Sequence, residues 1–594
     1  MTPLHEDNDN GIIIRETERK KKMRNDEQIR NEYDRWISAT SAGDAENTEL
    51  NNELRAMDQM SIEDAFYRDL AFGTGGLRGV IGAGTNRINI HTVAKASQGL
   101  ADYVNANFPD SPSVAIAYDS RIKSDVFSRT AAEVLAANGI RVHIYPQLMP
   151  TPCLSYAVRK LSCSAGIVIT ASHNPSKYNG YKVYGPDGCQ ITTEAASAIL
   201  AEIDKLDVFD DIRHMSFEEG MEKGIISYIE DDVYDSFTEE IMNQSVLFGD
   251  EIDRNVAIVY SPLNGTGLKP VTRALSEAGF TNITVVAEQE QPDGNFPTCP
   301  YPNPEIREAM ELGLQYCEKT GADLMLATDP DADRCGIAVK DGDEYKLLTG
   351  NEVGLLLLDY ICSQRIKHGM MPEHPVFVKT IVTMDLAEKI ADSYGVETVN
   401  VLTGFKFIGE VIGRMEAEGR EKDYICGFEE SYGYLTGTYV RDKDAVNAAF
   451  MICEMFAFYK TRGISLTEKL EEIYTAFGYC KNSLYSYAFE GSSGMLRMRE
   501  IMAAFRGQFA DDGSEDSSEI GGMTVEKVLD YSEGLDGLPK ANVIKYILKG
   551  GSSVVVRPSG TEPKLKLYVS VTADDKPKAS EAETAIVDYL HDYL

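Results

Sequence analysis

Short runs rich in apolar and β-branched residues alternate with helical stretches along most of this 594-residue chain. Residues 114–120 (VAIAYDS) predict a strand, and residues 126–139 (VFSRTAAEVLAANG) predict the helix that follows it. The same order returns at 255–267 (NVAIVYSPLNGTG) and at 322–334 (ADLMLATDPDADR). A repeated order of strand, turn and helix indicates α/β units whose sheets are largely buried.

The C-terminal part follows a different order. Residues 543–573 predict a strand, a Gly-Gly turn, a second strand, a loop and a third strand, and residues 583–594 predict a closing helix. This order indicates an α+β domain. Near the other end, Ile29, Tyr33, Trp36 and Ile37 predict one face of a helix.

A chain of this length divides into several domains, because single cores stop growing at about 250–300 residues. Residues 1–22 carry mixed charge blocks, which predict a flexible N-terminal extension. We place the domains after it at 23–245, 246–345, 346–485 and 486–594.

The formal net charge of −36 argues against nucleic acid and anionic membranes as partners. No apolar run reaches the roughly 20 residues of a membrane span. The ten cysteines occur without a CxxC pair, which argues against a zinc site and favours a reducing compartment. We expect a cytoplasmic protein that is a monomer or a weak homodimer.

Polar residues gather in four loops that follow predicted strands. The first, residues 170–188, presents Ser172 and His173 before an Asn-Pro turn, with Lys182 downstream. A serine beside a histidine and a lysine can act as a nucleophile or as a phosphate carrier. The alternative is an ordinary Asn-Pro turn in which both side chains are satisfied locally.

The second loop places Asp329, Asp331 and Asp333 at alternate positions after a strand. Carboxylates this close repel one another unless a hard divalent cation lies between them, which predicts a magnesium site. An EF-hand is excluded, because the sixth position of this loop is Arg334, where an EF-hand has glycine, and the twelfth is Lys340, where an EF-hand has glutamate. An acidic turn without metal is the alternative.

The third and fourth loops differ in charge. Glu429, Glu430 and Ser431 would repel phosphate but can accept hydrogen bonds from sugar hydroxyls; a solvated acidic turn is the alternative. In the fourth loop a guanidinium, two hydroxyls and a glycine turn form a phosphate cradle, with a plain hairpin loop as the alternative. Its residues are Arg557, Ser559, Gly560 and Thr561.

Two glycine-bearing segments support these loops. Residues 72–79 (FGTGGLRG) predict a backbone loop that holds Arg78 near phosphate, and their spacing does not match a dinucleotide fingerprint. Residues 402–409 (LTGFKFIG) place Lys406 on another glycine turn. No GxxxxGK[ST] loop is present, so the sequence does not indicate an ATP-hydrolysing P-loop.

The order TASHNP, DPDADR, FEES and RPSGTEP resembles the α-D-phosphohexomutase superfamily over residues 40–594. The length, the FGTGGLRG segment and the glycine turn at 265–267 resemble its phosphoglucomutase and phosphopentomutase-like branch. The resemblance implies three similar α/β domains with mixed sheets and a C-terminal α+β domain around a central cleft. In order, the domains would carry the phosphoserine, metal, sugar-binding and phosphate-binding loops.

The resemblance also implies roles for single residues. Ser172 would be the phosphoserine. It would also bind magnesium together with Asp329, Asp331 and Asp333, and Arg334 would close the loop that carries these aspartates. Lys182 would be the general acid or base, His173 an orienting residue, and Arg78 and Lys406 supporting contacts. Glu429 and Ser431 would bind sugar hydroxyls, and the loop from Arg557 to Thr561 would hold the phosphate that is not transferred. Pro330 and Ala332 stand where many members have glycine, so the metal loop should be stiffer.

The reaction implied is interconversion of glucose 1-phosphate and glucose 6-phosphate, with Mg²⁺ as cofactor and glucose 1,6-bisphosphate as intermediate and activator. The Glu-Glu pair resembles glucose-preferring members of the family. The alternatives are phosphopentomutase or phosphomannomutase activity, glucose 1,6-bisphosphate synthesis, and a non-catalytic interaction protein on the same scaffold.

Overall fold

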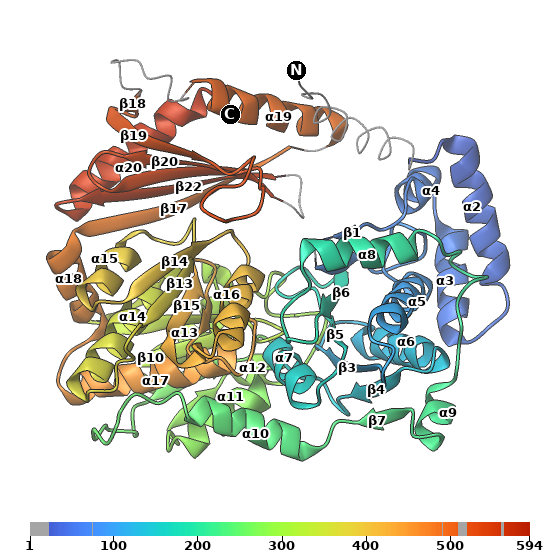
Figure 1. The fold of residues 1–594 in the computed structure, drawn as a ribbon, viewed down its shortest axis with the longest axis horizontal. Coiled ribbons are helices and arrows are strands. Elements are labelled where there is room, and N and C mark those ends of the chain that lie inside the picture. Colours follow the sequence, from blue (N-terminus) through green and yellow to red (C-terminus); the bar gives the residue numbers. More distant parts are fainter. Residues whose placement is uncertain (1–22, 74, 490, 509–518, 560–563) are drawn as a thin grey trace, which may run out of the picture. The chain divides into compact units, whose positions relative to one another are not determined.

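The computed structural model describes residues 23–594 except Thr74, Glu490, 509–518 and 560–563 (Figure 1). The predicted extension at 1–22 therefore lies outside the described residues. The described chain forms two compact units. The first comprises the chain up to Tyr234 with residues 264–266 and 292–302, and the second comprises the rest.

The described part of the first unit begins with three helices, which share a small hydrophobic core with Ala83 and Val208. The predicted helix face is confirmed, because Ile29 and Trp36 are buried and Tyr33 and Ile37 pack against the same core. Before each helix, a side chain accepts a hydrogen bond from a backbone N–H of the first turn, which has no partner within the helix. These helices are α2 (Asp26–Ala39), α3 (Ala45–Ala56) and α4 (Gln59–Phe66).

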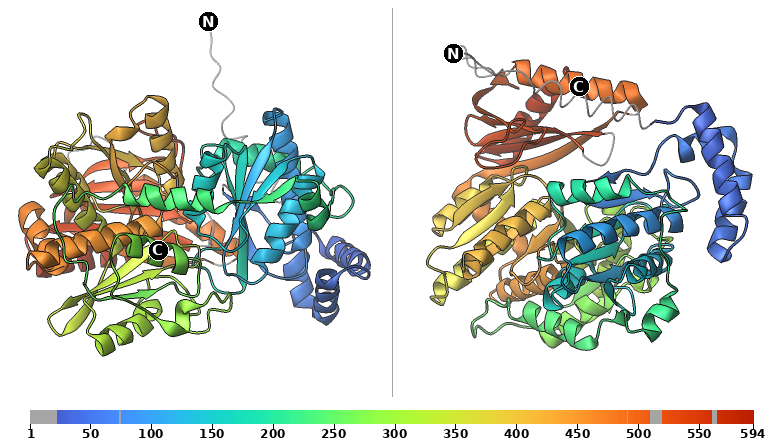
Figure 2. Two further views of the ribbon diagram at one scale, coloured as in Figure 1. Left: turned by 90° about the horizontal axis from the view of Figure 1, so that it is seen from below. Right: turned by 45° about the vertical axis from the view of Figure 1, so that its right-hand side comes forward.

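A seven-stranded sheet follows, in the order β1-β2-β6-β5-β3-β4-β7. The strands β5, β3, β4 and β7 are parallel, whereas β6, β2 and β1 extend the sheet antiparallel. The strands are β1 (Phe72–Gly73), β2 (Gly76–Val80), β3 (Ser113–Tyr118), β4 (Arg141–Ile144), β5 (Ala165–Ile169), β6 (Tyr178–Tyr184) and β7 (Ile226–Tyr228). The helices are α5 (Ile90–Asn107), α6 (Ser124–Ala137), α7 (Thr151–Lys160), α8 (Thr193–Ile203) and α9 (Phe217–Glu222), with several visible beside the sheet in Figure 2.

The second sheet, in the second unit, has the order β12-β11-β10-β8-β9. Here β10, β8 and β9 are parallel, and β11 and β12 are antiparallel. The strands are β8 (Ile258–Ser261), β9 (Ile283–Val285), β10 (Leu324–Thr328), β11 (Cys335–Asp341) and β12 (Glu344–Leu348). The helices are α10 (Asp231–Met242), α11 (Leu268–Glu277), α12 (Ala287–Glu290) and α13 (Arg307–Thr320).

The third sheet has the order β14-β13-β15-β16, with β16 antiparallel to β15. Its strands are β13 (Val376–Thr380), β14 (Glu397–Val401), β15 (Tyr424–Glu429) and β16 (Gly433–Leu435). Its helices are α14 (Gly350–Lys367), α15 (Leu386–Ser393), α16 (Phe405–Ala417), the short η1 (Glu421–Asp423), α17 (Ala445–Thr461) and α18 (Leu466–Phe477).

The fourth sheet is antiparallel, in the order β17-β22-β21-β20-β19-β18. Its strands are β17 (Tyr479–Ala488), β18 (Glu519–Ile520), β19 (Met523–Asp530), β20 (Ile544–Leu548), β21 (Ser552–Pro558) and β22 (Lys564–Ala573), with helices α19 (Gly491–Gln508) and α20 (Lys576–His591). The predicted order of strands and closing helix is confirmed, and so is the fold class of three mixed α/β sheets with a C-terminal α+β domain.

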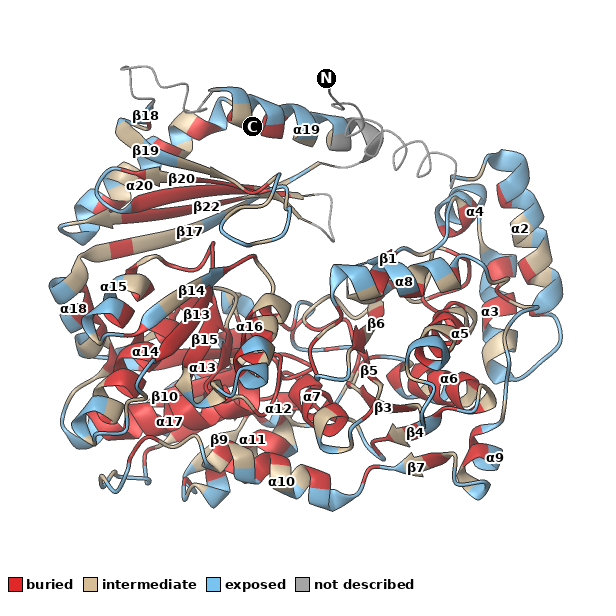
Figure 3. Ribbon diagram, viewed as in Figure 1, coloured by how far each residue is buried: buried red, intermediate tan, exposed pale blue. Residues whose placement is uncertain are grey.

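Burial follows the layers that the sequence pattern predicts. In Figure 3 strands β13, β15, β20 and β22 are mostly buried, whereas much of α19 is exposed. All ten cysteines are buried and free. Within the described part of the chain, no helix is both long enough and apolar enough to cross a bilayer.

Candidate active site

Three of the predicted loops occupy the same position in their sheets. Each leaves the carboxyl end of a parallel strand, namely β5, β10 or β15, and leads into the antiparallel neighbour β6, β11 or β16. Each loop also contains a non-glycine residue with positive φ, at Ser172 (53°), Ala332 (47°) and Tyr432 (64°). The carboxyl ends of parallel strands are where α/β sheets bind ligands, so the three loops are equivalent places for chemistry.

The Ser172 turn is held from inside the first unit. The backbone N–H of Ser172 donates to Thr170 Oγ1 at 2.8 Å, and Ser172 Oγ lies 3.1 Å from His173 Nδ1. Ser172 is only 4% exposed. The two side chains are therefore within hydrogen-bond distance of each other, on a turn where Ser172 has a left-handed backbone.

Arg121 lies beneath this turn and was missed in the sequence. Its guanidinium donates to the backbone carbonyls of Ser172, Asn174, Pro175 and Tyr178. Arg121 Nε lies 3.4 Å from Asp119 Oδ2, and the side chain stacks on the Phe296 ring. Burial raises the pKa of Asp119, and Arg121 counteracts that shift. Arg121 therefore fixes the backbone path that carries Ser172.

Arg78 and Lys182 lie in strands, so the prediction of loop positions for them was wrong. Arg78 is in β2 opposite Gly180, and Lys182 is in β6 opposite Gly76. Residues two apart in a strand share a face, so both side chains start from the same face of this strand pair, roughly 7–8 Å apart diagonally. A Cβ at Gly76 would approach Tyr181 O to 1.8 Å and one at Gly180 would approach Thr170 O to 2.3 Å. The glycines there permit close pairing of strands.

The three aspartates converge, as predicted. Their carboxylate oxygens lie within 4.8 Å of one another, and all three residues are buried. Asp329 Oδ1 also accepts the backbone N–H groups of Asp333 (3.1 Å) and Arg334 (3.0 Å), which closes the loop. Burial, followed by the charges of Asp331 and Asp333, raises the pKa of Asp329 well above its ordinary value. The cluster fits a divalent metal with oxygen ligands, whose charge would remove this penalty.

Lys443 is a second residue that was missed in the sequence. Its Nζ lies 3.2 Å from Asp333 Oδ2 and 3.0 Å from Asp442 Oδ1. Burial lowers its pKa, but Asp333, Asp442 and Glu429 raise it more, so the net shift is upward and the ammonium is retained. Lys443 thus supplies positive charge between the metal loop and Glu429. Arg334, in the same region, pairs with Glu305.

The sugar loop begins at the end of β15. Glu429 Oε1 accepts the backbone N–H of Gly404 at 2.9 Å, which brings the start of α16, and with it Lys406, beside this loop. Burial raises the pKa of Glu429. Burial and then the charge of Glu429 raise the pKa of Glu430 to about 7, while Arg557 lowers it. Glu430 can therefore both accept and donate a hydrogen bond near neutral pH.

The fourth loop is described only in part. Arg557 is half-buried near the end of β21, and the backbone N–H of Ser559 donates to Lys564 O at 2.7 Å. The electrostatic effect of Arg557 on Glu430 indicates that the phosphate and sugar loops are neighbours within the second unit. Gly560 and Thr561 lie outside the described residues. Among the predicted site residues of this unit, the aspartates, Arg334, Glu429, Lys406 and Arg557 thus form one continuous region.

Four family models match successive parts of the chain. They are the phosphoglucomutase/phosphomannomutase α/β/α domains I, II and III, at residues 69–208, 235–342 and 349–477, and the C-terminal domain of the same family at 509–587. The chain belongs to the phosphoglucomutase/phosphomannomutase family. The three equivalent loops are thus contributed one by each α/β domain of the family.

Relatives of this family are similar over nearly their whole length. A phosphoglucomutase from Staphylococcus saprophyticus is 39% identical over 518 residues, which cover 85% of this chain and 91% of the relative. A phosphoglucomutase from Staphylococcus aureus is 36% identical over 546 residues, covering 89% and 95%. The similarity therefore extends over all four domains.

Solved structures of the family share the fold. The phosphoprotein pp63/parafusin from Paramecium, a phosphoglucomutase, superimposes with a TM-score of 0.66 at 18% identity, covering 89% of this chain and 94% of that one. A phosphoglucomutase/phosphomannomutase family protein from Burkholderia thailandensis gives 0.64 at 18% identity, covering 88% and 97%.

Proposed function

We propose that the chain is a phosphoglucomutase that interconverts α-D-glucose 1-phosphate and glucose 6-phosphate through phospho-Ser172. Family membership and full-length relatives that carry this name make it a mutase of the phosphoglucomutase type. The observation that supports the proposed route best is the Ser172 turn, where a buried hydroxyl lies beside His173 on a backbone fixed by Arg121.

In the proposed reaction, the free hydroxyl of the sugar phosphate attacks the phosphorus of phospho-Ser172. The bond between phosphorus and Ser172 Oγ breaks as the new bond to the sugar oxygen forms, which yields glucose 1,6-bisphosphate. Lys182 takes the hydroxyl proton, and His173 orients the Ser172 oxygen. After the bisphosphate has turned over, its other phosphoryl group returns to Ser172 by the same steps reversed.

The cofactor proposed is Mg²⁺, held by Asp329, Asp331 and Asp333 together with a phosphate oxygen on Ser172. Such an ion neutralises charge on a transferring phosphoryl group. Lys443 and Arg334 both pair with Asp333, and the backbone N–H of Arg334 closes the loop onto Asp329.

The remaining loops supply binding and positioning. Glu429 and Ser431 accept hydrogen bonds from sugar hydroxyls in both orientations of the bisphosphate. Glu430 adds a carboxyl group whose pKa is raised to about 7. Arg557, Ser559, Gly560 and Thr561 hold the phosphate that is not transferred, and Arg78 and Lys406 add positive charge. Positioning and charge neutralisation account for most of the catalysis expected of phosphoryl transfer.

Replacement of Ser172 by Ala tests this route. We expect a loss of mutase turnover of at least about a thousandfold with unchanged thermal stability, measured with glucose 1-phosphate in an assay coupled to glucose 6-phosphate oxidation. Chelation of divalent metal should also abolish activity, and added Mg²⁺ should restore it. Near-normal turnover of Ser172→Ala would refute the phosphoserine.

The same assay separates the sugar alternatives. Glucose 1-phosphate, ribose 1-phosphate and mannose 1-phosphate are compared with and without added glucose 1,6-bisphosphate. We expect the highest kcat/KM for glucose 1-phosphate and activation by the bisphosphate. A preference for either other sugar would reassign the substrate and leave the phosphoserine chemistry in place.

A further inference from the structure

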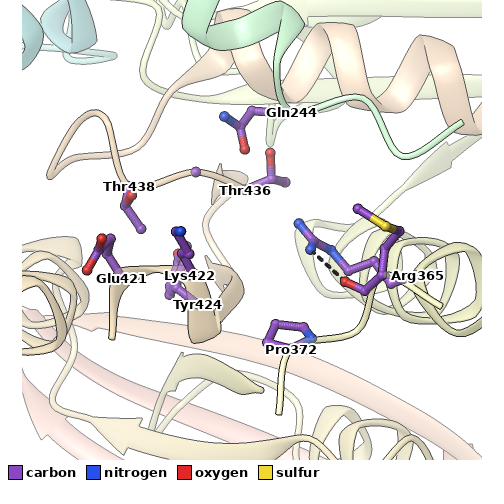
Figure 4. Close-up of a pocket in the computed structure, with 10 residues that line it drawn as sticks. Gln244, Arg365, Pro372, Glu421, Lys422, Tyr424, Thr436 and Thr438 are labelled. Carbon is purple, nitrogen blue, oxygen red and sulfur yellow. Dashed lines mark hydrogen bonds between the residues drawn. The ribbon is translucent and has the colours of Figure 1, made fainter. Parts of the chain in front are cut away.

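A pocket of about 400 Å³ lies in the second unit beside the third sheet (Figure 4). It is formed by the end of α14, the segment around η1 and the start of β15, the turn after β16, and Gln244. This volume is within the range of about 300–1,000 Å³ typical of small-molecule sites.

The pocket is separate from the proposed active site. It contains Tyr424, the first residue of β15, whereas Glu429 is the last residue of that strand. At about 3.3 Å per residue, the two ends of β15 are roughly 17 Å apart. The turn at 436–438 follows β16, which runs antiparallel to β15 and so ends at the same edge of the sheet. The pocket therefore opens at the edge of the third sheet opposite the one that carries Glu429.

Arg365 contributes a cation that the protein does not balance. The only described hydrogen bond of its guanidinium is a long one of 3.5 Å to Met370 O. The guanidinium forms no ion pair with a described residue, and its Nε is buried without a hydrogen-bond partner. Burial lowers the pKa of Arg365, and the effects that oppose this shift come from the thiols of Cys426 and Cys362 and not from a carboxylate. Neighbouring Lys367 and His368, in contrast, both approach Asp250. A partly buried, unbalanced guanidinium is costly unless a ligand supplies the anion.

Other polar groups face the same space. Figure 4 shows Lys422 and Glu421 across the pocket from Arg365, with Thr438 on their side and Gln244 above. Gln244 Nε2 uses one hydrogen for Glu240 O and retains another. Donors that converge from several elements suit a tetrahedral oxyanion better than a planar carboxylate, which a single guanidinium can satisfy. Glu421 would repel that oxyanion but can accept a hydroxyl from the rest of a ligand.

We propose that this pocket is a second ligand site, which binds the phosphate group of a small hydroxyl-bearing phosphate monoester against Arg365 and Lys422. The ligand's hydroxyl groups face Glu421. The site does not depend on the proposed mutase reaction, because none of its residues belongs to the four reactive loops. In a chain of net charge −36, these two cations supply the local attraction that an anion needs.

Hydrogen exchange measured by mass spectrometry tests the site with segment resolution. Inorganic phosphate and glycerol 3-phosphate are the probes. They are added to the Arg557→Gln variant, in which phosphate binding at the proposed active site is weakened. We expect exchange at 421–424 and 436–438 to slow at least twofold with one or both probes. Protection by glycerol 3-phosphate alone would support the contact of its hydroxyl groups with Glu421.

Arg365→Met should abolish this protection, and Lys422→Gln, at an exposed position, should weaken it. The matched control is Arg420→Met, because Arg420 lies in the same region but pairs with Asp423 and does not line the pocket. Arg365→Met should retain or raise the melting temperature in anion-free buffer, since it removes an unbalanced charge. Absence of protection by both probes, or equal protection in Arg365→Met, would overturn the proposal.

Discussion

Arg121 illustrates how a single side chain can fix a reactive turn without touching a substrate. Its guanidinium binds four backbone carbonyls around Ser172, and its charge is balanced by buried Asp119. A lysine would keep the charge beside Asp119, but a single ammonium cannot reproduce this planar fork. The position of the Ser172 hydroxyl would then be less well defined.

We therefore predict that Arg121→Lys lowers kcat about tenfold to a hundredfold with little change in KM, because small displacements of a reacting atom are costly. Steady-state kinetics with glucose 1-phosphate measures this. The control is Arg129→Lys, another arginine stacked on a phenylalanine ring but paired with exposed Glu218. Equal kinetics for both variants would count against a positioning role of Arg121.

Ala332 is one of the two residues, with Pro330, at which this metal loop departs from the glycines of many family members. It is buried and has φ of 47°, a conformation that costs a non-glycine residue roughly 1 kcal/mol or more. We predict that Ala332→Gly raises the free energy of unfolding by up to about 1 kcal/mol. Ala338→Gly, in the regular strand β11, should lower it by about 1 kcal/mol. Urea unfolding compares the two, and destabilisation by both would show that Ala332 is not strained.

The residues that sequence analysis identified lie in short motifs between a strand and a turn. Ser172 and the three aspartates follow strands and precede turns, so their position was predictable. Arg121 and Lys443 were not, because their partners are 51 and 110 residues away along the chain and no local spacing marks them. Arg78 was assigned to a loop because glycines usually break strands, whereas here they allow β2, β6 and β5 to approach closely.

At the scale of elements, His91 joins the N-terminal helices to the first sheet. It lies in the first turn of α5, its ring contacts Trp36 of α2 at 5.5 Å between centroids, and its Nε2 lies 2.8 Å from Asn47 Oδ1 in α3. Burial lowers the pKa of His91 to about 4, and His214 contributes to that shift. The packing of α2 and α3 on α5 therefore requires a neutral imidazole.

This gives a pH dependence with a definite sign. The unfolded chain binds the proton near its ordinary pKa of about 6.5, and the folded chain only near 4. Stability is therefore complete above about pH 6.5 and is lost as the pH falls toward 4, by up to about 3 kcal/mol. Denaturation followed by Trp36, the only tryptophan of the chain, measures it. His91→Gln should flatten the dependence, and exposed His591→Gln should not.

Element types were predicted better than element ends. The alternation of apolar runs and helical stretches located β3, β5, β8, β10 and the C-terminal hairpin, because local composition decides whether a segment is strand or helix. The parallel order of the strands depends on pairings between distant segments and was not visible. The domain boundaries at 245, 345 and 485 stay predictions.

At the scale of the whole molecule, a buried charge cluster joins the third sheet to the C-terminal sheet. Asp385 Oδ1 accepts from Lys379 Nζ of β13 (2.9 Å) and from Lys545 Nζ of β20 (2.7 Å), and Oδ2 accepts from Ser553 Oγ of β21 (2.8 Å). Burial opposes ionisation of Asp385, but the two lysines outweigh it and hold its pKa well below the ordinary range. Asp385 thus pairs with two buried ammonium groups from two domains, one of which, Lys379, also pairs with Glu388.

We predict that Asp385→Asn lowers the free energy of unfolding by about 3–5 kcal/mol, because it leaves buried lysine charge uncompensated. Urea unfolding measures the loss, and limited proteolysis should cleave the C-terminal domain first. Asp392→Asn, at an exposed position of α15, the helix that Asp385 precedes, is the control. A urea midpoint equal to that of the control would contradict the prediction. It would show that Glu388, which also pairs with Lys379, is enough to balance the lysine charge.

The ten buried thiols have a practical consequence for studying these domains. Because each thiol is buried, an alkylating reagent can reach it only when the surrounding structure opens. They are spread from Cys153 beside the first sheet, through Cys335 and Cys426 in the second and third, to Cys480 in the fourth. Alkylation followed by peptide mapping would therefore rank the four domains by how often each one opens, without any introduced label.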